Sequence, residues 1–334
     1  MAQTGGEPPR EYPGEGMAAE GGTIAFYGRG GELFGVFLVN LCLTLVTLGI
    51  YRFWARVRVL RYLWGQTAFA GDRFAYHNTG KELWKDWLKA ALIFGLPFFF
   101  LKNVGEFFAG NLPLQIIAAL LAYVLALVFI PIAMVNTRRY RLSRTSWRGI
   151  RFSFRGRVVD FIKLYLRGMW LSVMTLGLYT PIFAARRHAF MVSHAYVGNQ
   201  AWQFHGRGQE LFSSFVRAIL LFPFTLGLSW CWYTAAKRRY FWNHTALATA
   251  HFQCTVTGGP LLLFTLGNLL LLLCTVGFAW PWVVVRNVQF ALRYLTFVGD
   301  LDLASIRQDV QPASATGEGF MSFLNFLDTG LELG

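Results

Sequence analysis

Three basic side chains stand seven residues after an acidic residue that opens an apolar segment. The pairs are Glu82 and Lys89, Asp160 and Arg167, and Glu210 and Arg217. Seven residues are about two helical turns, so each pair lies on one helix face, with the cation roughly 10 Å along the helix. Cations that share one level of a helical bundle favour the binding of an anionic group.

Two amides stand near the same level. Asn40 follows the acid Glu32 by eight residues, and Asn268 follows Pro260 by eight. We interpret five side chains as candidates for one anion or lipid-headgroup site, with four acids as partners. The candidates are Asn40, Lys89, Arg167, Arg217 and Asn268, and the partner acids are Glu32, Glu82, Asp160 and Glu210. In the alternative interpretation, each cation reaches lipid headgroups or pairs with its own acid, and each acid stabilises a helix N-terminus.

Other reactive residue types show no catalytic or metal-binding pattern. The six histidines include no H-E-x-x-H spacing, and the cysteines at positions 42, 231, 254 and 274 form no C-x-x-C motif. A zinc site and a disulfide framework are therefore not indicated. No G-x-S-x-G or Walker sequence occurs either. We expect a protein that is not an enzyme and that has no cofactor and no metal site.

The helix-opening residues recur at fixed intervals, which indicates five related units. They stand at positions 32, 82, 160, 210 and 260, so the intervals are 50, 78, 50 and 50 residues. The long interval places 28 extra residues (78 − 50) inside the second unit. Two further features keep the register: a Thr-x-Gly element at Thr47, Thr175, Thr225 and Thr275, and a basic-aromatic pair at Arg61-Tyr62, Arg139-Tyr140 and Arg239-Tyr240.

Each unit reads as an apolar helix, a bend, a basic amphipathic helix and a short β-hairpin. In the first unit, helices are expected at about 32–48 and 52–64, with the bend at Gly49. Ala70 to Arg73 separates two short alternating runs, which is typical of a β-hairpin. Thr79 and Glu82 then fit a capping box at the start of the next helix.

The composition indicates a membrane protein. Of 334 residues, 55% are hydrophobic and only 14% are charged, whereas soluble domains carry roughly 25% charged residues. The runs 33–54 and 260–285 are long enough to cross a bilayer, which takes about 20 apolar residues. The net charge of +14 is interpreted as a cytoplasmic topology signal and not as a sign of nucleic-acid binding.

We therefore expect a polytopic α-helical membrane protein built from five repeats of about 50 residues. The membrane domain is expected to span 23–309, with repeats at about 30–80, 81–157, 158–207, 208–257 and 258–309. Residues 1–22 read as a disordered tail without a cleaved signal peptide. Residues 310–334 read as a polar linker and a short amphipathic tail.

The number of membrane crossings per repeat stays open. With one crossing, successive hairpins alternate between the two sides of the membrane. If each unit enters and returns, all hairpins share the cytoplasmic side and can pair into one sheet. The distribution of Lys and Arg agrees better with the second arrangement.

Several stretches of the first unit resemble a known family. They are Thr-Leu-Gly-Ile-Tyr-Arg-Phe-Trp-Ala-Arg at 47–56, Arg-Tyr-Leu-Trp-Gly-Gln-Thr at 61–67 and Gly-Asp-x-Phe-x-Tyr-His-x-Thr-Gly-Lys-Glu-Leu at 71–83. These motifs resemble the YjgN-like bacterial inner-membrane proteins, which form a domain of unknown function. The resemblance is also specific at 175–212 and implies a multi-pass protein of the bacterial inner (plasma) membrane. It brings no activity and no catalytic residues.

Two classes of function remain. The first is a transporter or channel-like binder of an anionic solute or lipid headgroup, which would use the five candidate residues. The second is a non-catalytic membrane scaffold or regulatory protein that organises lipid or a protein partner. In both, the expected partners are membrane lipids with anionic headgroups and not nucleic acid; the identity of a protein partner stays open.

Overall fold

The computed structural model describes residues 24–107, 111–299 and 306–308, so the two predicted tails lie outside the described residues. The strands are β1 Ile24–Phe26, β2 Thr67–Phe69, β3 Asp72–Tyr76, β4 Thr145–Trp147, β5 Ile150–Phe154, β6 Ala195–Val197, β7 Gln200–Phe204, β8 Thr245–Leu247, β9 Ala250–Cys254 and β10 Leu295–Val298. The helices are α1 Gly30–Val46, α2 Arg52–Gly65, α3 Gly80–Ala90, α4 Leu96–Phe107, α5 Leu112–Ser143, α6 Val158–Met174, α7 Thr180–Ser193, α8 Glu210–Leu221, α9 Ser229–Asn243, α10 Gly258–Cys274 and α11 Trp280–Arg293, and the π-helical stretch η1 Ala91–Gly95 joins α3 to α4.

The described strands pair antiparallel, in chain order, into one ten-stranded sheet. Tight two-residue turns join the strands of a pair. In the first, Phe69 pairs with Asp72 across Ala70 and Gly71, whose φ angles are +50° and +84°. Positive φ at both central residues is the geometry that matches the twist of a hairpin, so the hairpin predicted here is confirmed. Successive pairs then bond to each other, as where Phe74 of β3 pairs with Trp147 of β4.

The sheet curls until its two ends approach each other. Phe69 of β2 meets Phe297 of β10 edge to face, with ring centroids 5.2 Å apart. Ile24 of β1 packs in the same apolar cluster. On its other side Phe69 contacts Trp147, at 5.4 Å between centroids. Aromatic side chains from strands far apart in the sequence therefore form one core inside the curve.

Helices surround the sheet in a repeating arrangement. Each unit has a first helix (α1, α3, α6, α8 or α10) and a second helix (α2, α5, α7, α9 or α11) before its strands. Each second helix packs on the first helix of the next unit, and α11 of the last unit packs on α1 of the first. Glycine permits this approach: a Cβ at Gly30 would overlap the indole of Trp282, and one at Gly80 would overlap Trp54.

The N-terminal strand completes the last unit. The second helices α2, α5, α7 and α9 each pack on the second strand of their own unit, which is β3, β5, β7 and β9. The last unit contributes β10 alone among the described strands, and its helix α11 packs on β1 instead. The two ends of the described chain thus meet along one seam, between α11 and β10 on one side and β1 and α1 on the other.

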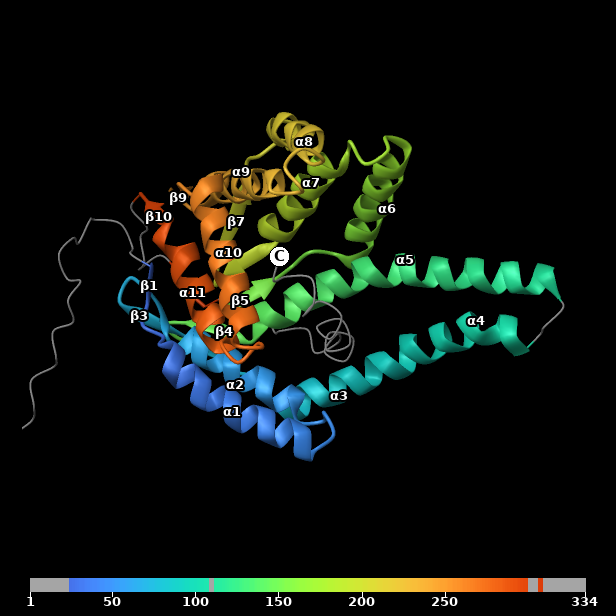
Figure 1. Ribbon diagram of the computed structural model, residues 1–334, viewed down its shortest axis with the longest axis horizontal. Coiled ribbons are helices and arrows are strands. Elements are labelled where there is room, and N and C mark those ends of the chain that lie inside the picture. The colour runs from blue at the N-terminus through green and yellow to red at the C-terminus, as the bar shows by residue number, and fades with distance from the viewer. Residues whose placement is uncertain (1–23, 108–110, 300–305, 309–334) are drawn as a thin grey trace, which may run out of the picture.

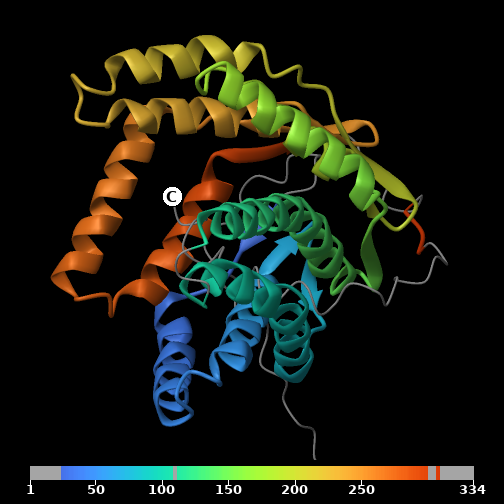
Figure 2. The same cartoon turned by 90° about the vertical axis from the view of Figure 1, so that its right-hand side faces the viewer.

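A long arm projects from this body. Helices α4 and α5 run side by side away from the sheet (Figure 1), and Phe94 meets Phe129 with ring centroids 4.5 Å apart. In the described part of the chain, α5, with 32 residues, is the one helix long and apolar enough to cross a membrane. Figure 2 shows the arm nearly end-on, with the α1/α2, α8/α9 and α10/α11 turns at the periphery around it.

The predicted fold class, a polytopic helical membrane protein of five repeats, is wrong. The described residues contain one candidate membrane span. The element that connects them from one end to the other is the ten-stranded sheet. Hydropathy misled because it joined two helices into one run. The apolar run 33–54 is α1, a turn at 47–51 and the start of α2, and the run 260–285 divides in the same way between α10 and α11. Helices α1 and α10 have only 17 residues each.

Candidate functional site

The helix-opening acids contact the end of the second helix of their own unit. The contacts are Tyr62 hydroxyl to Glu32 Oε2 at 2.8 Å, Arg144 Nη2 to Glu82 Oε2 at 3.2 Å and His244 Nε2 to Glu210 Oε2 at 3.5 Å. Asp160 is exposed at the start of α6. Among the described contacts, none pairs an acid with the cation seven residues further on. The acids fasten the two helices of a unit together close to the sheet.

The three candidate cations lie apart. Lys89, Arg167 and Arg217 are exposed on α3, α6 and α8. Arg217 Nε donates to the carbonyl of Ser213 on its own helix, at 3.2 Å. Within the residues that the structure describes, no hydrogen bond or ion pair joins any two of these cations. Their arrangement suits three separate contacts with an anionic surface, and a single shared site stays a prediction.

The two candidate amides are buried between helices. Asn40 Nδ2 donates to the carbonyl of Ala55 at 3.4 Å and so joins α1 to α2. Asn268 Nδ2 donates to Asn287 Oδ1 at 3.2 Å and joins α10 to α11. In both amides the buried Oδ1 atom has no hydrogen-bond partner among the described groups. The amides therefore connect the two helices of a unit.

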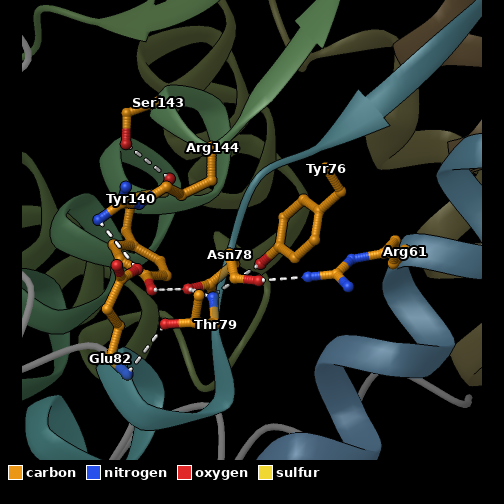
Figure 3. A network of polar contacts seen from close by, with 8 residues as sticks. All are labelled: Arg61, Tyr76, Asn78, Thr79, Glu82, Tyr140, Ser143 and Arg144. Carbon is orange, nitrogen blue, oxygen red and sulfur yellow. Dashed lines mark hydrogen bonds and ion pairs between the residues drawn. The ribbon is translucent and has the colours of Figure 1, made fainter.

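A polar network around Asn78 joins the first unit to the second (Figure 3). Asn78 is only 1% exposed. Its Oδ1 accepts from the hydroxyl of Tyr140 at 2.6 Å and from the backbone N–H of Thr79 at 2.8 Å. Its carbonyl accepts from Arg61 Nη2 at 2.9 Å, and its Nδ2 donates to the hydroxyl of Tyr76 at 3.3 Å. The network fixes the loop that leads from β3 into α3.

Equivalent contacts occur in other units. The further contacts are Arg29 N–H to the hydroxyl of Tyr62 at 2.8 Å, Gly208 N–H to the hydroxyl of Tyr240 at 2.5 Å, and Arg139 Nη2 to the carbonyl of Gly156 at 2.9 Å. Thus the tyrosine of a basic-aromatic pair holds the loop before its own unit, and the arginine holds the loop after it. Sequence reasoning used these pairs only as markers of register, although their recurrence was the available signal.

A cationic cluster that sequence reasoning missed lies between α5, α7 and α9. The rings of His188 and Phe241 stack, with centroids 4.2 Å apart and planes 6° from parallel. Lys237 Nζ lies 5.9 Å from the centre of the same Phe241 ring. Burial, helped by the charges of Arg138, Lys237 and Arg187, lowers the pKa of His188 to about 4. The recurrence of Arg187 and Lys237 at one register, fifty residues apart, was the signal in the sequence.

The cluster is suited to attract an anion. Among the described residues, no carboxylate forms an ion pair with Arg187 or Lys237. Burial, followed by the charges of Arg187 and Arg238, lowers the pKa of Lys237. A negatively charged group would therefore relieve repulsion between these side chains.

Two further histidines contact neighbouring groups of the chain. His77 Nε2 lies 2.8 Å from Ser146 Oγ, and His194 Nδ1 lies 2.9 Å from the carbonyl of Phe190. Within residues 24–107, 111–299 and 306–308, no three His, Cys, Asp or Glu side chains gather in a way that could hold a metal ion.

Four turns between a first and a second helix share one hydrogen-bonding pattern in the described residues. Each has a threonine whose hydroxyl donates to the carbonyl four residues earlier and accepts from the N–H four residues later. In one of them, Thr225 Oγ1 lies 2.7 Å from the carbonyl of Leu221 and 3.1 Å from the N–H of Ser229. The others are centred on Thr47, Thr175 and Thr275. The turns thus satisfy their own backbone groups, as an apolar surrounding requires.

The residue after each threonine is a nearly fully exposed apolar side chain. These residues are Leu48, Leu176, Leu226 and Val276, which are 88–95% exposed and have φ angles of +49° to +50°. The left-handed conformation costs a non-glycine residue roughly 1–2 kcal/mol. In water, such a side chain gains no burial in return. The feature therefore points to a contact partner outside the chain.

The chain is similar to proteins of the bacterial inner membrane. The family model described as "Bacterial protein of unknown function (DUF898)" matches residues 22–228 and 214–323. Inner membrane protein YjgN of Salmonella typhimurium (strain LT2) is 31% identical over 132 residues, which cover 40% of this chain and 31% of the relative. Inner membrane protein YjgN of Escherichia coli K12 is 29% identical over 173 residues, or 49% and 38%. The chain thus spans about a third of the length of these curated relatives, and no solved structure matches it.

Proposed function

Because this chain belongs to the DUF898 family of bacterial proteins, whose curated relatives are inner membrane proteins, we propose that it is a non-catalytic protein that organises lipid in that membrane. The observation that carries the proposal is the set of four turns. Each combines an exposed leucine or valine, a left-handed backbone and internally satisfied hydrogen bonds. Lipid is the surrounding that suits this combination, because burial of the side chain offsets the strain of the left-handed backbone and the satisfied backbone groups need no water.

The spacing of charges agrees with insertion of the turns into one leaflet. Arg167 precedes Leu176 by nine residues, and Arg217 precedes Leu226 by nine. At the helical rise of 1.5 Å per residue, which applies as far as Met174 in α6 and Leu221 in α8, nine residues span at most about 13 Å, close to half of the ~30 Å hydrocarbon core. With the turn in the acyl chains, the arginine reaches the level of the headgroups, where anionic lipids attract it. Anionic headgroups are therefore the partners that we propose.

The arm supplies a second lipid-facing surface. Phe99 and Phe100 of α4, and Ile116 and Leu120 of α5, are exposed although they are large and apolar. Only 28% of the apolar window in α5 is buried within the chain. A surface of this kind on a water-soluble protein would promote aggregation, whereas in a bilayer it is solvated.

Transport of an anionic solute is the second candidate function. The observation that favours it is the cluster of Arg187, Lys237 and His188. The five residues proposed from the sequence favour it less, because three are exposed on separate helices and two are buried between helices.

Depth-dependent fluorescence quenching tests the lipid proposal. We would replace Cys42, Cys231, Cys254 and Cys274 by serine, and place one labelled cysteine at Leu176 or at Leu226. In vesicles of phosphatidylglycerol and phosphatidylcholine, nitroxides on the acyl chains should quench both labels strongly. The matched control is Ala248→Cys, which shares the left-handed conformation (φ +52°) but lies in a hairpin turn of the sheet. Equal, weak quenching at all three positions would refute the proposal.

A further inference from the structure

An apolar groove lies where the last unit meets the first. It measures about 460 Å³ and is lined by Phe34, Leu271, Thr275, Phe278, Ala279 and Trp282. Ligand sites in proteins commonly measure roughly 300–1,000 Å³. The one charged residue in its lining is Arg286 of α11, which is exposed. The groove thus offers a long apolar wall and a single cation.

A missing aromatic ring explains why the space is present. In the first unit the guanidinium of Arg58 lies 5.4 Å from the ring centre of Tyr51, seven residues earlier. In the third unit Arg186 lies 5.7 Å from Tyr179, again seven residues earlier. In the last unit the residue seven before Arg286 is an alanine, Ala279.

The arginine of the last unit therefore has a different surrounding. Arg286 lies 5.8 Å from the ring centre of Phe264, on the neighbouring helix α10. The groove occupies the position that the tyrosine ring fills in the first and third units. It continues to Phe278 in the α10/α11 turn. Next to Phe278 and Gly277 in that turn is Val276, one of the four nearly fully exposed apolar residues.

We propose that this groove holds one acyl chain of an anionic phospholipid from the surrounding bilayer, with Arg286 bound to its phosphate. The inference rests on the proposed function, because insertion of the α10/α11 turn brings the groove to the lipid. The apolar lining excludes a polar solute, and no acidic residue lines the groove. A guanidinium binds phosphate through two parallel hydrogen bonds, so Arg286 favours a phosphate over a neutral headgroup.

The test is to count lipids bound to the purified full chain by native mass spectrometry. Dioleoyl phosphatidylglycerol and dioleoyl phosphatidylcholine share their acyl chains and differ in net charge. Ala279→Tyr restores the ring that Tyr51 and Tyr179 supply in other units, and it should weaken the tightest phosphatidylglycerol binding at least about tenfold. Arg286→Gln should abolish the preference of this tightest site for phosphatidylglycerol over phosphatidylcholine. The matched control is Arg186→Gln, which should leave both lipids bound as in the wild type.

Two results would overturn the proposal. One is wild-type phosphatidylglycerol binding in Ala279→Tyr, and the other is an unchanged preference for phosphatidylglycerol over phosphatidylcholine in Arg286→Gln. If oleate binds in the groove and phosphatidylglycerol does not, the occupant is a free fatty acid and the phospholipid assignment is wrong. Should Ala279→Tyr fail to fold, Arg286→Gln at an exposed position decides alone. Quenching at Val276→Cys in the Ala279→Tyr background reports insertion of the α10/α11 turn separately, so a failure of the groove is distinguishable from a failure of the proposed function.

Discussion

His188 lies among the basic side chains of three helices, and its folded pKa of about 4 differs from the ~6.5 of an unfolded histidine. Between these values the unfolded chain binds more protons than the folded chain. The stability contributed by neutral His188 is therefore fully present above about pH 6.5 and is lost as the pH falls towards 4. Low pH stabilises the unfolded state because the folded cluster cannot easily accept another positive charge.

Acidification should consequently lower the melting temperature, and His188 should account for part of the change. At pH 5 this one group would cost about 2 kcal/mol relative to pH 7.5. His188→Gln keeps a planar side chain beside Phe241 without the titration, so its melting temperature should fall less between the two pH values. The control is His251→Gln, at an exposed position on β9. The interpretation fails if His188→Gln and the wild type lose the same stability.

Single residues also show what a sequence can and cannot reveal. Half of the predicted capping box is confirmed: the Glu82 N–H donates to Thr79 Oγ1 at 3.4 Å, but the Thr79 N–H donates to Asn78 Oδ1 and the Glu82 carboxylate pairs with Arg144. The partner of Asn78 was not predictable, since Tyr140 lies 62 positions away. Nor were the cationic partners of His188, which come from three helices. Local chemistry leaves a mark in the sequence, whereas a contact between units depends on the fold.

At the scale of elements, the turn between a first and a second helix holds an exposed apolar residue in a strained backbone conformation. Glycine would adopt a φ of +50° without strain, yet four such positions in the described chain carry leucine or valine. A buried leucine side chain contributes roughly 1.5–3 kcal/mol, which exceeds the strain if the turn lies in lipid. This balance explains why the most exposed positions keep apolar residues.

The double variant Leu176→Gly/Leu226→Gly should separate stability from membrane attachment. In detergent its unfolding free energy should equal or exceed that of the wild type by up to about 1 kcal/mol, because relief of strain opposes the entropy that glycine adds to the unfolded chain. From vesicles, however, lower detergent concentrations should extract it. Ala248→Gly has the same backbone change in a sheet turn and should extract like the wild type. Unchanged extraction of the double variant would contradict a role of these leucines in lipid.

Hairpins and helix starts were accessible from the sequence, but helix lengths were not. The predicted turn at Ala70 to Arg73 is confirmed because glycine and short alternating runs are local signals. The two helices of a unit were harder to separate, since α1, the following turn and the first residues of α2 are apolar almost without interruption. Composition indicates contact with lipid and does not say whether a segment crosses the bilayer or turns back within it.

For the whole molecule, the sequence offered a single sheet only as one of two arrangements, because its strands are three to five residues long. Such strands are stable only when they pair with others, and pairing between units leaves no pattern in the sequence. All described strand pairs join one sheet, so the hairpins lie together instead of in two separate places.

The seam between the two ends of the described chain should be a point of weakness. Ile24→Asp would place a charge in the apolar cluster that contains Phe69 and Phe297. We expect hydrogen exchange to increase mainly in β1, α1, α11 and β10, and much less in α6 and α7 on unit three. Mass spectrometry of exchanged peptides measures this directly. A uniform increase throughout the chain would mean that the seam is no weaker than other contacts between units.

The contact between β1 and α11 also has a consequence for folding during biosynthesis, because the two elements are synthesised far apart in time. The strand Ile24–Phe26 leaves the ribosome before helix α11, Trp280–Arg293, which follows about 250 residues later. At typical bacterial translation rates of roughly 5–20 residues per second, the strand waits on the order of 13–50 s for that helix. During this interval the edge of β1 is an unoccupied template for strand pairing. Nascent chains on one polysome are therefore most exposed to mispairing with each other before helix α11 is made.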